Sequence, residues 1–109
     1  MASTTVHSNV RTYDITTNVK TIIANTGHPR PDGVLEISTR AGDTLGSGTL
    51  SVVASNEASP AVGTAAHWST IAGMEALEVG KTYRVRVSAG TVALALTGSS
   101  GASLSVQVI

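Results

Sequence analysis

Apolar and polar residues alternate one by one in several short stretches of this chain, and this period of two constrains the fold more than any other feature. Successive side chains of a β-strand point to opposite faces, so the alternation predicts strands with one buried and one exposed face. Val, Ile, Thr and Tyr, which favour strands, are abundant in these stretches. They span residues 12–16, 19–23, 34–38, 50–55, 82–88 and 103–108.

Glycine- and proline-containing segments separate the predicted strands. Residues 25–33 combine Pro and Gly in a loop, because Pro removes a backbone donor and Gly permits positive φ. Ala89-Gly90 predicts a tight connection and Gly98-Ser99-Ser100-Gly101 a longer one. We therefore predict that residues 82–109 form a C-terminal three-stranded meander.

The number and spacing of the strands predict an all-β fold. About seven or eight short strands with turns between them indicate a single antiparallel β-sandwich, jelly-roll-like, with a small barrel as the alternative. Residues 57–66 are predicted to be loop, 67–71 a strand, and 73–80 a turn or short strand. We expect one domain over residues 10–109. Residues 1–9 are expected to be a flexible arm that could add as a strand to a neighbour.

Composition excludes several classes of function. The 109 residues suit one domain, and 7 Lys+Arg against 7 Asp+Glu give no electrostatic footprint for nucleic acid or anionic membranes. The absence of Cys excludes disulfides and a thiol nucleophile. The longest apolar stretch, Val92–Leu96, is far shorter than the roughly 20 residues of a membrane span. The first residues do not resemble a secretory signal peptide, so we expect the chain to be made and used in a cytoplasm, or assembled into something there.

No motif for catalysis or cofactor binding is found. His7, His28 and His67 lack the spacing of metal ligands, and a Gly-x-Ser-x-Gly nucleophile elbow is missing. His28 and Asp32 share a loop where they could meet a cation, or be merely solvated. We therefore predict a protein that is not an enzyme and has no catalytic, cofactor-binding or metal-binding residues.

The candidate interface comprises Ala93, Ala95, Trp68, Arg84 and Arg86. In the stretch 91–97 the face opposite Val92, Leu94 and Leu96 carries only the two alanines, so both faces of this strand are apolar. That small-residue face is either roofed by a loop or packed on another subunit. Trp68 either fills the core of the sandwich or stands outside as an interface anchor or sugar platform.

Arg84 and Arg86 lie two residues apart on one predicted strand, close to Lys81. Charges of this kind on a strand protect a sheet edge from aggregation. The same charges would also suit docking to an acidic partner surface.

The pattern as a whole resembles the small β-sandwich structural proteins of tailed bacteriophage virions, especially head-decoration proteins. The resemblance covers residues 34–109 and is carried by the run Leu77–Val87 and the ending Leu96–Val108, with a Ser/Thr-rich start after Met1. It implies a non-enzymatic virion protein that binds the major capsid protein or other virion proteins, stabilises the shell, and forms a homo-oligomer, with a trimer favoured. The alternative is a carbohydrate- or receptor-binding module of a phage tail or fibre.

Overall fold

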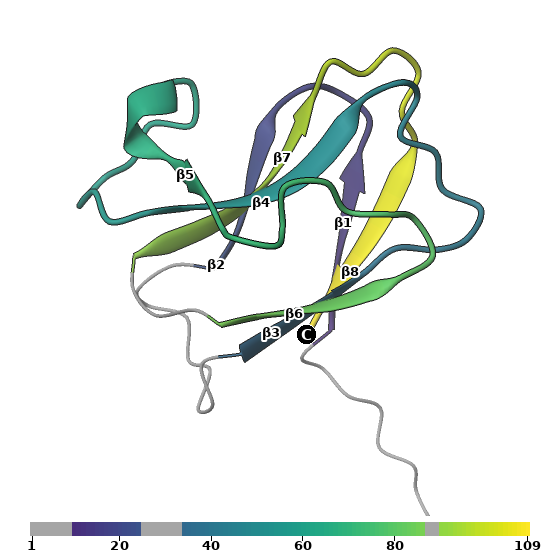
Figure 1. Ribbon diagram of the computed structural model, residues 1–109, viewed down its shortest axis with the longest axis horizontal. Coiled ribbons are helices and arrows are strands. Elements are labelled where there is room, and N and C mark those ends of the chain that lie inside the picture. The colour runs from purple at the N-terminus through teal and green to yellow at the C-terminus, as the bar shows by residue number, and fades with distance from the viewer. Residues whose placement is uncertain (1–9, 25–33, 87–89) are drawn as a thin grey trace, which may run out of the picture.

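The alternating stretches form strands in the computed structural model, which describes residues 10–24, 34–86 and 90–109 (Figure 1). The strands are β1 (Arg11–Ile15), β2 (Lys20–Ala24), β3 (Val34–Ser38), β4 (Thr49–Ser55), β5 (Ser69–Thr70), β6 (Thr82–Arg86), β7 (Thr91–Thr97) and β8 (Leu104–Val108). The 3-10 turn η1 (Ala65–His67) precedes β5. Within these ranges, no helix has the length and apolar character needed to cross a bilayer.

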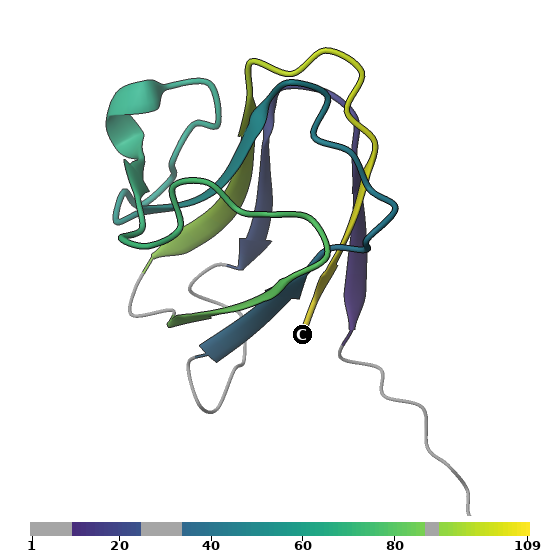
Figure 2. The same cartoon turned by 45° about the vertical axis from the view of Figure 1, so that its right-hand side comes forward.

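The strands form two four-stranded antiparallel sheets that face each other (Figures 1 and 2). The first sheet has the order β1-β8-β3-β6 and the second the order β2-β7-β4-β5. The pairs β1/β8, β2/β7, β3/β6 and β4/β5 are nested, as though one long hairpin ribbon had been rolled into a sandwich. This is the jelly-roll arrangement, so the predicted fold class is confirmed.

The predicted C-terminal meander is wrong, although its three strands are present. β6 lies in the first sheet, β7 in the second and β8 in the first again, so none of them pairs with the next. A period of two tells which side chains share a face, but it does not tell which strand lies alongside. Because packed sheets are only about 10 Å apart, even a connection of a few residues can cross from one sheet to the other.

Aliphatic side chains from both sheets fill the space between them. Leu35 and Ile37 of β3, Val52 of β4, Leu94 of β7 and Val106 of β8 each have 0% of their surface exposed. Burying an aliphatic side chain of this size stabilises a fold by about 1.5–3 kcal/mol. The remaining buried members of this cluster are Ile15, Ile23, Ala24, Leu50, Leu77, Val85, Val92, Leu96, Ala102, Leu104 and Val108.

The segment between β4 and β6 is mostly irregular, as its sequence predicts. Residues 56–64 form turns and loop, and the strand predicted over residues 67–71 is reduced to the two residues of β5. Residues 71–81 consist of successive turns, with Gly73 and Gly80 at φ 84° and 80°. Only glycine adopts this left-handed conformation at little cost, which explains why the helix-favouring residues between them do not form a helix.

Candidate docking surface on the outer faces of the sandwich

The outer face of the second sheet carries the two alanines of β7. Strand pairing places Ala93 opposite Val53 of β4, and Ala95 opposite Ser51. Ala93 is 0% exposed and Ala95 5% exposed, although their side chains point away from the main core. They form a second small cluster with Val53 and Trp68. The small side chains leave room for an indole ring to lie over the sheet.

Residues 56–68, hereafter the roof, cover this face. The indole Nε1 of Trp68 donates to the carbonyl oxygen of Ala61 over 2.9 Å, and the N–H of Ala61 donates to Nδ1 of His67 over 3.1 Å. The Lys20 ammonium on β2 donates to the carbonyl oxygen of Val62 over 3.2 Å. Figures 1 and 2 both show η1 outside the strands, next to β5 and β4. The first two bonds hold the roof together, and the third attaches it to β2.

Of the two alternatives for the alanine face, the structure shows the one in which a loop of the same chain covers it: Ala93 is fully covered, and Ala95 keeps 5% of its surface exposed. Trp68 is 9% exposed, so its assignment as an exposed interface anchor or sugar platform is wrong. Its assignment to the core of the sandwich needs a correction too, because Trp68 packs on the outer face rather than between the sheets. Trp68 packs on this outer face because the small side chains of Ala93 and Ala95 leave a shallow apolar surface for the indole ring.

No part of the chain that the structure describes covers the outer face of the first sheet, hereafter the open face. Because Arg11 pairs with Val108, the register places Val10 opposite Ile109. Two backbone hydrogen bonds of 3.0 and 3.1 Å place Glu36 next to Ile109 on the other side. One row of side chains across the sheet is Val10, Ile109, Glu36 and Arg84, and the next is Thr12, Gln107, Ser38 and Thr82. None of these residues is buried.

Arg84 and Arg86 lie on the open face, at the edge formed by β6. Arg84 Nε is 3.1 Å from Glu36 Oε2, with 76% and 38% of the two side chains exposed. An ion pair this exposed contributes about 0–1 kcal/mol to stability. Its main effect is on charge, because Glu36 neutralises one of the two arginines. The structure therefore brings Arg84 and Arg86 together and separates them from Ala93, Ala95 and Trp68, which lie in the other sheet.

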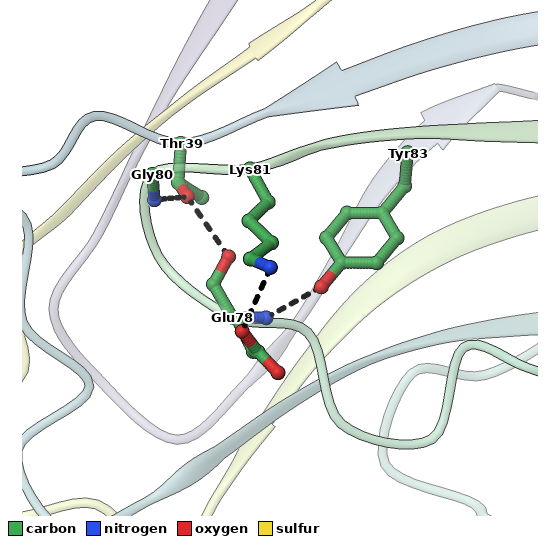
Figure 3. Close-up of polar contacts among 5 residues, drawn as sticks. All are labelled: Thr39, Glu78, Gly80, Lys81 and Tyr83. Carbon is green, nitrogen blue, oxygen red and sulfur yellow. Dashed lines mark hydrogen bonds and ion pairs between the residues drawn. The ribbon is translucent and has the colours of Figure 1, made fainter.

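A network of hydrogen bonds at the start of β6 holds this arginine-bearing edge in place (Figure 3). The hydroxyl of Thr39 accepts from the N–H of Gly80 over 2.8 Å and donates to the carbonyl oxygen of Glu78 over 3.4 Å. The hydroxyl of Tyr83 accepts from the N–H of Glu78 over 2.9 Å. Lys81 Nζ lies 3.4 Å from Glu78 Oε1. Lys81 is thus paired within the turn and does not extend the arginine pair.

Sequence reasoning missed Val10, Ile109 and Glu36 as members of the open face. The alternation along residues 34–38 already places Glu36 opposite the buried Leu35 and Ile37. Its contact with Arg84, 48 residues away, depends on strand order, which no local pattern gives.

Outside the two outer faces, the described residues offer few side chains that could bind a metal ion or take part in catalysis. Within the described ranges, no group of three or more His, Cys, Asp or Glu side chains is placed to hold a metal ion. His67 accepts a backbone hydrogen bond in the roof, and His7, His28 and Asp32 lie outside the described residues, as does the predicted arm over residues 1–9. Comparison of the chain with protein-family models, with curated proteins and with solved structures finds no match.

Proposed function

We propose that this chain is a structural protein of a tailed-bacteriophage virion, a head-decoration protein that binds the assembled capsid surface and stabilises it. The observation that supports this most is the contrast between the two outer faces. The chain uses its own roof to cover one face, whereas the open face presents Arg84, Arg86 and rows of polar and aliphatic side chains that are not buried. Rows of side chains across a sheet suit docking onto a broad, ordered surface rather than enclosing a small molecule.

The size of the open face favours a multivalent mode of binding. Four strands about 4.8 Å apart and five residues long, at about 3.4 Å per residue, cover only about 330 Å². A stable interface between two proteins usually buries about 800 Å² on each partner. One copy would therefore bind weakly, and a homo-oligomer such as a trimer would gain avidity on a lattice of identical sites. A trimer is part of this proposal, with the major capsid protein as partner.

The binding experiment mixes the purified chain with expanded, undecorated shells of the phage that encodes it. We expect the chain to sediment with the shells and to raise their melting temperature by mass action. The double variant Arg84→Glu/Arg86→Glu should lower occupancy severalfold. Arg11→Glu serves as the matched control, because Arg11 is exposed on β1 but has the opposite orientation to the open face. If the folded wild-type chain neither binds the shells nor changes their melting, the proposal is wrong.

The alternative, a carbohydrate- or receptor-binding module of a tail or fibre, relied on an exposed aromatic ring. Trp68 belongs to the roof and is buried against the second sheet, and Tyr13 and Tyr83 are partly buried against the core. These are all the aromatic residues of the chain. We therefore favour the decoration role, with the virion as the site of action.

A further inference from the structure

β2 is an edge strand of the second sheet, and no strand of the described residues pairs with its outer edge, hereafter the free edge. β2 lies at one end of the order β2-β7-β4-β5. The N–H of Leu96 in β7 donates to the carbonyl oxygen of Val19 over 3.3 Å. In an antiparallel ladder the direction of these bonds alternates, so the backbone groups of Lys20 and Ile22 point away from β7, toward the free edge. This edge therefore offers donors and acceptors to an additional strand.

Exposed aliphatic residues gather around the same strand. Val19 is 50% exposed, Ile22 40% and Val62 46%, and these are three of the five large hydrophobic residues exposed in the described part of the chain. The edge strand β6 differs, because its outward side chains are Thr82, Arg84 and Arg86. Charges usually protect strand edges, and Lys20 is the one charged side chain of β2, so aliphatic side chains make up much of the surroundings of this edge.

A hollow of about 270 Å³ lies beside β2, between the strand, β7 and the roof. Its walls combine aliphatic side chains with three polar residues, Asn18, Lys20 and Thr97. The lining residues are Asn18, Val19, Lys20, Val62, Gly63, Ala95, Leu96 and Thr97. Pockets for drug-sized ligands usually measure about 300–1,000 Å³, so this hollow suits a single side chain better.

Lys20 gives the edge its charge preference. Its ammonium group donates to the carbonyl oxygen of Val62, and no carboxylate lies within ion-pair distance among the described residues. Lys81 and Arg84, in contrast, each have a glutamate partner. The side chains of Lys20 and Ile22 share the outer face of the sheet, opposite Ala95 and Ala93. A carboxylate placed opposite Lys20 would complete this arrangement.

We propose that the β2 edge binds an extended segment of a partner protein, which adds to the second sheet as a fifth strand. The segment carries an acidic residue opposite Lys20 and an aliphatic residue two positions away on each side. One aliphatic side chain then packs on Ile22, and the other enters the hollow next to Val62. Backbone hydrogen bonds provide affinity, and the alternate side chains provide specificity.

A second copy of this chain fits the edge less well than such a partner. Antiparallel pairing of two β2 strands about a twofold axis centred on Lys20 or Thr21 would place both Lys20 side chains on one face, opposite or diagonal to each other. Like charges at such positions are destabilising. The inference is also independent of the proposed capsid-binding role, because β2 and the open face belong to different sheets. Either proposal can fail while the other holds.

Capped seven-residue peptides test the proposal directly. Threonine occupies the odd positions and valine the second and sixth, and the central residue is glutamate, glutamine or lysine. Titration of the ¹⁵N-labelled chain should shift the amide signals of β2 and slow hydrogen exchange at Lys20 and Ile22. We expect the glutamate peptide to bind about threefold to tenfold more tightly than the lysine peptide. Alternate backbone amides of the peptide point toward β2, and the others point away from it. N-methylation of the amides in the first set should abolish binding, whereas N-methylation of those in the second set should leave binding intact.

Two substitutions complete the experiment. Lys20→Glu should reverse the preference from the glutamate peptide to the lysine peptide, a result that loss of folding cannot mimic. Ile22→Lys should abolish peptide binding. Thr12→Lys, which also introduces a lysine on an exposed face of an edge strand but in β1, should leave binding intact. Binding that ignores the central charge, that survives both sets of N-methylation, or that shifts signals away from β2 would overturn the proposal. Absence of binding by all peptides at millimolar concentration would overturn it too.

Discussion

The hydroxyl of Tyr83 accepts a hydrogen bond from the backbone N–H of Glu78 over 2.9 Å, which ties the edge strand β6 to the turn that precedes it. A bond of this kind contributes about 0.5–1.5 kcal/mol. We predict that Tyr83→Phe lowers the free energy of unfolding by about 1 kcal/mol, measured by urea denaturation. Tyr13→Phe is the control, because Tyr13 is also half-buried in the first sheet but its hydroxyl has no hydrogen bond among the described residues. Equal losses in both variants would show that the bond is unimportant.

Added volume beneath Trp68 should disturb the roof without opening the main core. We predict that Ala93→Leu lowers stability by about 1–3 kcal/mol, because no space exists around a side chain that is 0% exposed. The fluorescence emission of Trp68 should move to longer wavelength as the indole is displaced into water. Ala65→Leu makes the same addition at an exposed position of η1 and should change neither quantity. An unchanged emission spectrum in Ala93→Leu would contradict the roofed arrangement.

Gly90 allows the chain entering β7 to pass close to the end of β4. Its φ is 70°, and a Cβ there would overlap the carbonyl oxygen of Ser55. We predict that Gly90→Ala costs more than about 3 kcal/mol, because the left-handed backbone and the overlap both oppose it. Gly98→Ala isolates the first effect, since Gly98 has φ 67° with nothing within 4 Å of the added atom, and it should cost about 1–2 kcal/mol. Thermal denaturation of the two variants distinguishes these contributions, and similar losses would argue against the close approach.

Glu36 should limit binding rather than support folding. Its ion pair with Arg84 is exposed, so Glu36→Gln should change the unfolding free energy by less than about 1 kcal/mol. If the open face docks on an acidic capsid surface, the same substitution frees Arg84 and should lower the concentration needed for half-saturation of the shells. Glu57→Gln, an exposed change at the start of the roof, should have no effect on binding. Weaker binding by Glu36→Gln would indicate that the partner surface is not acidic.

Much of the fold could be predicted from alternation, and the reason is visible in β3 and β8. Leu35, Ile37, Leu104, Val106 and Val108 all face the core as the period of two requires. The prediction of an antiparallel sandwich needed no more than the number of such strands and the turns between them.

The order of strands and the nature of the alanine face could not be predicted in the same way. Thr39 and Gly80 are 41 residues apart, and Lys20 and Val62 are 42 residues apart, yet each pair is joined by a hydrogen bond. The meander failed because sequence neighbours were assumed to pair. The alanines were correctly identified as covered on both sides, but only the structure distinguishes a roof supplied by the chain itself from one supplied by another subunit.

The nested pairing of the strands also sets the time at which this protein can fold. β1 pairs with β8 and β2 with β7, so the first sheet cannot close until the ribosome has released the segment that contains β8. Only β4 and β5 pair across a short separation, and β5 has two residues. Folding is therefore expected to be slow for a domain of this size, because distant segments have to meet before they gain contacts.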